Sequence, residues 1–460
     1  MDNNGFIYLG KRIKKIGFLG LGKSNRGVAK YLLRNFYDLE FTLRSQKPTD
    51  LTGIPAKRIL FGDGALSEID EDLLFLSPSA RQDKKELIDA KNRGVILSSD
   101  AELFFSRSPA DIYAVTGSDG KSTTTYLTAK LLGEAYEKAV PCGNFGDALT
   151  PHLDDAPGFA YVTELSSFQL SYIKPKSRRC VITNITENHL NWHTSFGEYI
   201  EAKRNILSNS DGRILNFDCD VSREFLHDYE IFAVISQKHS EDKLRQKVKA
   251  DLYFTLSDNK IIANRDEILD TNKIFLGGKH NVFNFMAAIA MSYGICSKEA
   301  ILRLAHNFKG LPHRCEFFGE FSGVKFYDSS IDSSPKRCAA TLNTFPDRII
   351  VILGGRSKGL DFKELIPTLI KKAKSIVLTG ENGRDAELAL NSDTAFSESG
   401  IPLVRIDNFF DAAEYAARIA VAGDCVVLSP AATSYDSFSD FEERGNAFKK
   451  HIKDLQSKGI

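Results

Sequence analysis

The 460-residue sequence contains no long hydrophobic run, no excess of charge of either sign and only 14 prolines. No stretch approaches the ~18 consecutive apolar residues of a membrane-spanning helix, so membrane insertion is not expected. Sixty Lys and Arg balance sixty Asp and Glu, so the chain has no net positive charge of the kind that nucleic-acid-binding proteins carry. With 42% hydrophobic and 26% charged residues, the composition is typical of a globular protein rather than a disordered or fibrous one.

Cysteine is also scarce, and its spacing argues against two structural roles. The seven cysteines include no C-x-x-C pair, which argues against a zinc ribbon, and an odd number does not suit a disulfide framework. The first 15 residues place their apolar stretch before their positive charges, unlike a secretory signal. Together these absences predict reduced thiols and a cytoplasmic location.

Internal repeats and low-complexity tracts are absent too, and what recurs is a short apolar run followed by a helix-forming stretch. That alternation is typical of parallel β-sheets. The expected strands fall in three series: 15–19, 39–43, 58–61, 73–76 and 95–97; then 112–115, 160–163, 181–185, 214–217 and 232–235; then 324–327, 349–353, 376–378, 403–406 and 425–428. A hairpin is expected over 251–264, and helices over 281–293, 362–372 and 411–421. We therefore expect an α/β protein of three consecutive domains, 1–108, 109–309 and 310–460.

The most specific motif follows the strand 112–115. Gly117 and Gly120 form a loop that runs into a helix beginning with Lys121 and Ser122, the order of a phosphate-binding loop. The common pattern needs a glycine where Val115 stands, so Gly117 is the working glycine here. The residues expected to bind ATP are Gly117, Ser118, Asp119, Gly120, Lys121, Ser122 and Thr123. Lys121 would reach the outer phosphates and Ser122 would ligate Mg²⁺.

A second glycine motif follows the first strand. Gly20 and Gly22 start a G-x-G-x-x-G pattern, but Asn25 stands where the third glycine is needed. The next strand ends in Arg44 rather than in the acid that would hold a ribose. The motif is therefore weak as a dinucleotide site, and a tight turn that admits another diphosphate remains open.

Beyond the phosphate-loop motif lie three residues that are individually ambiguous. Glu164 ends an apolar strand, where it is either a metal ligand or a satisfied acid. His189 follows another strand, but the zinc-binding H-E-x-x-H pattern is absent. Taken alone, the sequence around Lys203 predicts a residue on a solvated helix face. In the third series, polar segments at 354–359 and 429–436 follow strands, which suits a small anionic substrate at the sheet edge.

Taken together, the motifs resemble the Mur ligase family of ATP-dependent amide-bond-forming enzymes. The resemblance rests on TGSDGKS (116–122), ELSSFQL (164–170), NITENH (184–189), GLPHRCE (310–316), GGRSKG (354–359) and SPAATSYDSF (429–438). It implies Rossmann-like first and third domains around a central ATPase domain, in a monomer. It also implies that D-glutamate is added to UDP-N-acetylmuramoyl-L-alanine through an acyl phosphate, in peptidoglycan precursor synthesis.

The resemblance also assigns site residues. Catalysis and two Mg²⁺ ions would involve Lys121, Ser122, Glu164, His189 and Lys203, with Lys203 carbamylated. Further ATP contacts would be Asn281, Arg314 and Asp328. The UDP-sugar would be bound by Gly22, Lys23, Ser24, Asn25, Arg44, Ser77 and Asn144. D-Glutamate would be bound by Ser333, Lys358, Ser434 and Phe441.

Several positions depart from the family pattern. Asn188 and Asn191 replace expected acids near His189, and Ser79 stands where glycine is more common. The ribose-contacting acid aligns with Ser329, which leaves Asp328 one place early. Two alternatives remain open: a related Mur or folylpolyglutamate-type ligase with another acceptor, and a non-catalytic nucleotide-binding relative.

Overall fold

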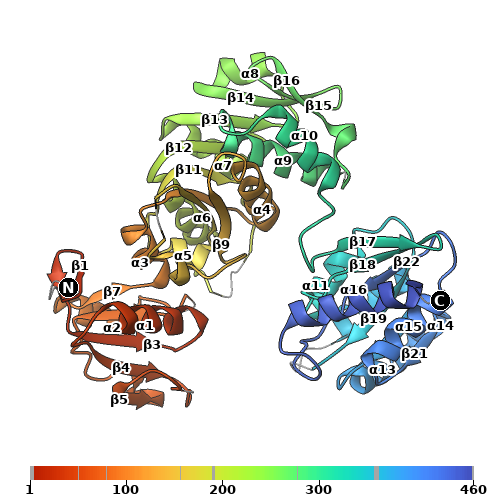
Figure 1. Ribbon diagram of the computed structural model, residues 1–460, viewed down its shortest axis with the longest axis horizontal. Coiled ribbons are helices and arrows are strands. Elements are labelled where there is room, and N and C mark those ends of the chain that lie inside the picture. The colour runs from red at the N-terminus through yellow and green to blue at the C-terminus, as the bar shows by residue number, and fades with distance from the viewer. Residues whose placement is uncertain are drawn as a thin grey trace. The chain divides into compact units, whose positions relative to one another are not determined.

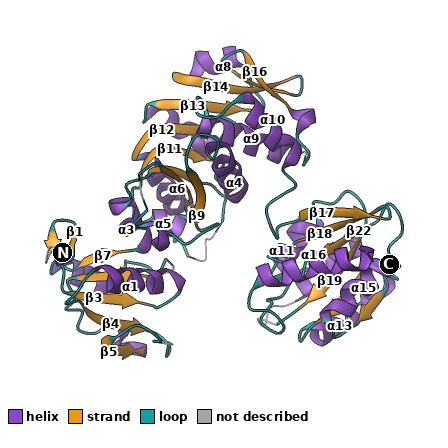
Figure 2. Ribbon diagram, in the orientation of Figure 1, coloured by secondary structure: helices purple, strands orange, loops and turns teal. Residues whose placement is uncertain are grey.

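The computed structural model describes residues 5–49, 51–78, 80–155, 157–188, 192–276, 278–356 and 362–457. The chain divides into two compact units, Met1–Asn307 and Phe308–Ile460. Figure 1 traces the elements of each unit, and Figure 2 shows strands gathered into sheets with helices against them. The expected α/β class with mainly parallel sheets is confirmed. Among the described residues, no helix is both long and apolar enough to cross a membrane.

The first sheet has five parallel strands in the order β5-β4-β3-β6-β7. Its strands are β3 (Lys15–Leu19), β4 (Glu40–Ser45), β5 (Ala56–Phe61), β6 (Leu73–Leu76) and β7 (Ile96–Ser98), after a small pair, β1 (Ile7–Tyr8) and β2 (Lys11–Arg12). Its helices are α1 (Lys23–Asn35), η1 (Gly62–Leu66), α2 (Lys85–Asn92) and α3 (Asp100–Arg107). The strand order reverses between β3 and β6, and open α/β sheets bind ligands outside the carboxyl ends of such strands.

The second sheet has nine strands in the order β16-β15-β14-β13-β12-β11-β8-β10-β9. Its strands are β8 (Asp111–Thr116), β9 (Lys138–Gly143), β10 (Phe159–Glu164), β11 (Lys176–Ile182), β12 (Asn209–Asn216), β13 (Ile231–Ser236), β14 (Ala250–Ser257), β15 (Lys260–Ala263) and β16 (Asp266–Asp270). Its helices are α4 (Lys121–Leu132), η2 (Thr150–His152), α5 (Ser167–Leu170), α6 (Phe196–Arg204), η3 (Asn205–Leu207), α7 (Asp220–Glu224), η4 (Phe225–His227), α8 (Glu241–Lys247), η5 (Thr271–Lys273), α9 (Lys279–Ser292) and α10 (Lys298–Asn307). The expected hairpin is β14–β15, and its turn residues Asp258 and Asn259 have φ values of 49° and 58°, as a two-residue hairpin turn requires.

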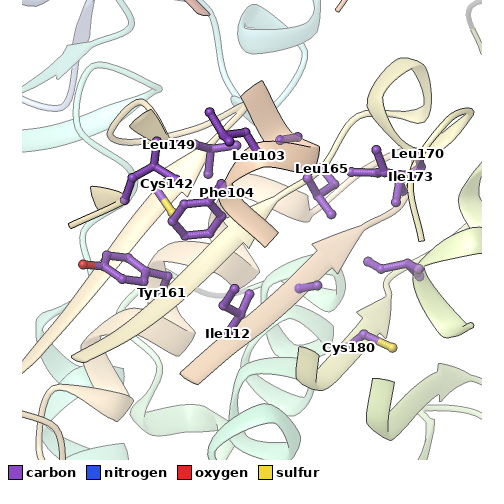
Figure 3. Packing of buried hydrophobic residues seen from close by; sticks show 14 of the residues in the cluster. Leu103, Phe104, Ile112, Cys142, Leu149, Tyr161, Leu165, Leu170, Ile173 and Cys180 are labelled. Carbon is purple, nitrogen blue, oxygen red and sulfur yellow. The ribbon is translucent and has the colours of Figure 1, made fainter. Parts of the chain in front are cut away.

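One hydrophobic core joins the first two sheets. Helix α3 follows the last strand of the first sheet, yet Phe104 on it packs edge-on against Tyr161 of β10, with ring centroids 5.5 Å apart. Figure 3 shows Leu103 and Phe104 near Cys142, which lies on β9, and near Leu149, which lies between β9 and η2. Since burial of apolar area is the main favourable term in folding, α3 ties the two sheets into one unit.

The second unit contains a six-stranded sheet in the order β17-β18-β22-β19-β20-β21, parallel except for β17. Its strands are β17 (Glu316–Phe321), β18 (Val324–Asp328), β19 (Ile349–Gly354), β20 (Ala373–Thr379), β21 (Leu403–Arg405) and β22 (Cys425–Leu428). Its helices are α11 (Pro335–Leu342), η6 (Phe362–Glu364), α12 (Ile366–Lys372), α13 (Gly383–Asn391), α14 (Thr394–Glu398), α15 (Phe409–Ile419) and α16 (Phe441–Ser457).

One expected helix differs in the structure, and the domain division is left untested. The expected helix 362–372 is broken into η6 and α12, because Pro367 lies in the first turn of α12 and supplies no amide to continue the preceding turn. The division into three domains stays a prediction, since the first of the two compact units holds two of the three large sheets.

Candidate active site

The loop between β8 and α4 has backbone geometry that requires glycine at two positions. Gly117 has a φ of 152° and Gly120 a φ of 77°, both in the left-handed half of the map. A Cβ atom on Gly117 would collide with Thr183 Oγ1, and one on Gly120 would collide with Asn284 Oδ1. The displaced glycine of the motif therefore allows close contact with the end of the neighbouring strand β11.

The segment after β11 holds this loop in shape. The Asn184 carbonyl accepts from the Ser118 amide at 2.9 Å, and Asn184 Oδ1 accepts from the amides of Ser118 and Asp119 at 3.1 and 2.9 Å. Thr183 Oγ1 donates to the Asp119 carbonyl at 2.6 Å, and Ser118 Oγ donates to Thr186 O at 2.9 Å. Because these two amides are used inside the protein, phosphate contacts are expected from Gly120 onward.

Helix α4 supplies the amino terminus that such a loop needs to bind an anion. It runs for 12 residues from Lys121, and its first amides and its dipole favour negative charge at this end. Lys121 Nζ donates to the Ser118 carbonyl at 3.0 Å, which keeps the ammonium over the loop. Asn284 of α9 lies beside Gly120, and its Nδ2 donates to Asn281 Oδ1 at 3.5 Å. These residues fit the phosphates of a nucleoside triphosphate.

Glu164, at the end of β10, is a buried carboxylate with a side-chain donor on only one of its two oxygens among the described residues. The side chain is 2% exposed, and Oε1 accepts from Asn144 Nδ2 at 2.8 Å. Oε2 is buried and has no hydrogen-bond partner among the described residues. A buried carboxylate oxygen without a donor is costly, and a bound cation removes that cost. Glu164 therefore fits a Mg²⁺ ligand, and Asn144 orients it.

Lys203 on α6 is buried, at 2% exposure, and is not on a solvated helix face. Its Nζ donates to the Gly117 carbonyl at 2.7 Å and lies 4.7 Å from the centre of the Tyr199 ring. Burial lowers the pKa of Lys203 well below its ordinary value, and the charge of Lys121 lowers it further. The neutral amine is the form that reacts with CO₂, and a lowered pKa favours that form, so the site fits a carbamylated lysine.

The structure thus brings the phosphate loop, Glu164 and Lys203 into one site at the carboxyl ends of β8 and β10. His189, the remaining expected metal ligand, lies outside the described residues, as do Ser79, Asn191 and Lys358. Tyr199 and Asn184 were not assigned roles from the sequence alone. Asn184 belongs to the quoted NITENH motif, and its position directly after a strand is the signal that could have identified it.

The expected sugar-nucleotide loop lies at the strand-order reversal of the first sheet. Gly20 has a φ of 79°, and Ser77 follows β6 next to it, with its amide donating to the Leu19 carbonyl at 3.1 Å. Asn25 is buried, and its Nδ2 donates to the carbonyls of Gly20 and Phe75 at 2.7 and 3.2 Å. Asn25 therefore links the ends of β3 and β6. Gly22 and Lys23 are exposed and Ser24 is half-buried at this edge.

Arg44 does not face this edge, which corrects its assignment to the UDP moiety. The side chain is fully buried and makes two hydrogen bonds to Glu71, at 2.9 and 3.1 Å. Its remaining donors bond to backbone carbonyls of the segment after β5, at Ala65, Ser67 and Glu68. All five guanidinium N–H groups are thereby used within the domain, so Arg44 is a structural residue. The sequence shows the basic residue at a strand end but not its buried partner.

In the second unit, Asp328 is fully buried at the end of β18. Its Oδ2 lies 2.7 Å from His313 Nδ1 and its Oδ1 accepts from the Ser330 amide at 2.9 Å. Lys449 Nζ is 3.6 Å from the same carboxylate. A ribose contact of Asp328 stays a prediction, as does the role of the exposed Arg314.

The loops expected to bind D-glutamate are held by a buried arginine that was not singled out from the sequence. Arg444 on α16 is 2% exposed and donates to Ser330 Oγ and to the carbonyls of Ala432 and Thr433 at 3.0–3.1 Å. It thereby links the segments after β18 and β22. Ser434 beside it is buried, and Ser333 is half-buried. The ring of Phe441 lies 6.0 Å from that of His313.

Comparison with known proteins agrees with this geometry. The chain matches the Mur ligase middle domain over residues 115–292 and the Mur ligase glutamate ligase domain over residues 313–432. It is 38% identical to the UDP-N-acetylmuramoylalanine–D-glutamate ligase of Ruminiclostridium cellulolyticum, covering 96% of this chain and 97% of that protein. It is 36% identical, with the same coverage, to the ligase of that name from Acetivibrio thermocellus.

Solved structures show the same fold. The UDP-N-acetylmuramate–alanine ligase MurC of Thermotoga maritima aligns with a TM-score of 0.54 at 19% identity, over 96% of this chain and 99% of that one. A UDP-N-acetylmuramoyl-L-alanyl-D-glutamate–2,6-diaminopimelate ligase aligns with a TM-score of 0.52 at 18% identity, over 96% and 92%.

The fold and the site define a nucleotide-dependent α/β enzyme with a phosphate loop beside a buried acid and a buried lysine. The chain belongs to the Mur ligase family, whose members are ATP-dependent amide-bond-forming ligases that use Mg²⁺.

Proposed function

We propose that this chain joins D-glutamate to UDP-N-acetylmuramoyl-L-alanine in the synthesis of peptidoglycan precursors. The observation that carries the proposal is the 38% identity, over nearly the full length of both chains, to a ligase of that specificity. The phosphate loop with the unpartnered Glu164 oxygen and the buried Lys203 supports the ATP-dependent step.

The chemistry follows from charge. A carboxylate is a poor acyl donor, so an oxygen of the L-alanyl carboxylate attacks the γ-phosphorus of ATP, and ADP leaves. The amine of D-glutamate then attacks the acyl carbon, phosphate leaves with its electron pair, and the amine loses a proton. Lys121 and the amino terminus of α4 offset the repulsion between the anionic carboxylate and the anionic phosphate.

Mg²⁺, when bound, neutralises phosphate charge and polarises the transferred group. Ser122 and Glu164 would hold one ion, and a carbamylated Lys203 with His189 would hold a second. Two observations support this assignment: the buried Oε2 of Glu164 has no hydrogen-bond partner among the described residues, and burial lowers the pKa of Lys203.

We further propose that residues 1–108, 109–309 and 310–460 bind the sugar nucleotide, ATP and D-glutamate respectively, in a monomer that works in the cytoplasm. All seven cysteines are free, as suits a reducing compartment.

The proposal is tested by phosphate release from ATP with Mg²⁺ and UDP-N-acetylmuramoyl-L-alanine, in the presence of D-glutamate, L-glutamate or no amino acid. We expect release that requires both the sugar nucleotide and D-glutamate. Release with another acceptor or amino acid would move the assignment to a different ligase, and no release under any combination would favour a binding role.

A further inference from the structure

The loop that follows β6 in the first sheet reaches the site of the second sheet through one arginine. Arg81 Nη1 donates to the Trp192 carbonyl, and the guanidinium carbon lies 4.9 Å from the centre of the Trp192 ring. Its Nη2 lies 3.2 Å from Glu198 Oε1, and its Nε donates to Asp83 of the same loop at 2.8 Å. The Arg81 side chain is 24% exposed, so these contacts are partly shielded from water.

One partner of Arg81, Glu198, belongs to the helix that carries Lys203. Glu198 lies in the first turn of α6, five residues before Lys203. Its other oxygen, Oε2, accepts from the amide and the hydroxyl of Thr194, both at 2.6 Å. Glu198 therefore fixes the start of α6 and holds Arg81 at the same time.

The Glu198 carboxylate also lies near His193, which in turn contacts the helix that follows Glu164. His193 Nδ1 lies 3.8 Å from Glu198 Oε1, and His193 Nε2 lies 2.9 Å from Ser167 Oγ. Ser167 begins α5, three residues after Glu164. The His193 side chain is buried, so this connection runs through the interior. Arg81 thus contacts a network that includes the first turn of the helix carrying Lys203 and the helix that begins three residues after Glu164.

The position of Arg81 makes this network sensitive to the first sheet. Arg81 is four residues after Ser77, in the loop at the strand-order reversal where α/β sheets bind ligands. A guanidinium is a planar fork, so its three polar partners and its stacking on an indole are met together only in one loop position. A shift of the loop on ligand binding must therefore change the contacts with Trp192 and Glu198.

We infer that Arg81 is a positioning residue that couples binding of the sugar nucleotide to the arrangement of the metal and phosphate site. The inference rests on the proposed function for the identity of the ligand. Coupling between two sites is reciprocal, so the sugar nucleotide should tighten binding of a Mg²⁺–ATP analogue by the same factor by which the analogue tightens binding of the sugar nucleotide.

The test is titration calorimetry of the full chain with UDP-N-acetylmuramoyl-L-alanine and a non-hydrolysable Mg²⁺–ATP analogue, each alone and in the presence of the other. We expect Arg81→Ala to reduce the coupling factor about threefold to tenfold, Glu198→Gln to do the same, and Arg81→Lys to reduce it less. The matched control is Arg34→Ala: Arg34 pairs with Asp154 between the same two sheets but contacts neither Trp192 nor Glu198.

A second readout does not depend on affinity. Trp192 is the only tryptophan of the chain, so its fluorescence reports on the Arg81 contact directly. Addition of the sugar nucleotide should change this fluorescence in the wild type and in Arg34→Ala, and much less in Arg81→Ala. A merely structural role would lower the melting temperature while leaving the coupling factor and the fluorescence response in place.

The outcomes separate the two proposals. Absence of sugar-nucleotide binding by the wild type would overturn the proposed function, and this inference with it. Binding without coupling in the wild type, or coupling that Arg81→Ala leaves within twofold, would overturn the inference alone.

Discussion

Replacement of Asn144 by alanine tests whether this residue positions Glu164 or only contacts substrate. Asn144 is expected from the family resemblance to touch the muramoyl-alanine part, yet its Nδ2 donates to Glu164 Oε1 at 2.8 Å. Glu164 is 2% exposed, and its Oε2 has no hydrogen-bond partner among the described residues, so Asn144→Ala leaves neither oxygen with the donor that Oε1 now has. The carboxylate is then free to turn away from the position that suits Mg²⁺.

The size of the effect follows from that one bond. A hydrogen bond to a charged group contributes about 1.5–3 kcal/mol, and each ~1.4 kcal/mol is a factor of ten in an equilibrium constant. We therefore expect the Mg²⁺ concentration for half-maximal activity to rise about 10-fold to 100-fold, the range found when groups that orient metal ligands are removed.

The assay is phosphate release as a function of Mg²⁺ at saturating substrates, together with the KM for the sugar nucleotide. Asn209→Ala is the matched control, because the Asn209 amide donates to a neutral carbonyl, that of Lys174, on the surface of the same sheet. A Mg²⁺ dependence within twofold of the wild type, with a KM for the sugar nucleotide raised tenfold, would refute the positioning role and leave a substrate contact.

Three further predictions concern the other buried charges. Glu164→Ala should abolish ADP formation while the melting temperature stays near that of the wild type, and near-normal turnover would contradict the metal assignment. Lys203→Ala should be inactive and partly rescued by short carboxylic acids. In the wild type, burial lowers the Lys203 pKa, so reactivation by CO₂ after its removal should speed up as pH rises through that lowered pKa and level off below the ordinary lysine range. Failure of rescue together with a flat pH profile of reactivation would argue against the carbamate. Glu71→Ala should leave Arg44 buried without its acid and cost about 3–5 kcal/mol of stability, visible as a lower melting temperature of the first unit; an unchanged melting curve would show that the pair contributes nothing.

Much of the fold could be predicted from the sequence, because apolar runs and turn residues report on local structure. The predicted strands 15–19, 73–76 and 425–428 coincide with β3, β6 and β22. Strand β9 was missed because its sequence KAVPCG contains Pro141 and Gly143, which sheets tolerate mainly at an edge, and β9 is an edge strand. The break before α12 was missed because Pro367 was counted within a helical pattern.

From local sequence alone, the part of the site that could be predicted is the phosphate loop, because its backbone conformation requires glycine at fixed positions. The glycines of the phosphate loop are needed for its turn and its close contacts, and they identify it from local sequence. The roles of Lys203 and Arg44 depend on burial and on distant partners. Lys203 is buried against Gly117, 86 residues away, and Arg44 against Glu71, 27 residues away. Neither environment leaves a trace in the nearby sequence.

The packing of α3 determines how this chain could be divided or recombined. Phe104 on α3 fills the core beneath β10, so a cut at residue 108 would remove an interior ring from the second sheet and open a cavity there. The boundary between the two compact units falls between Asn307 and Phe308, after the last helix of the unit that holds this core. A hybrid enzyme made from two relatives should therefore be joined at this second position, because a junction there leaves the core shared by the first two sheets intact.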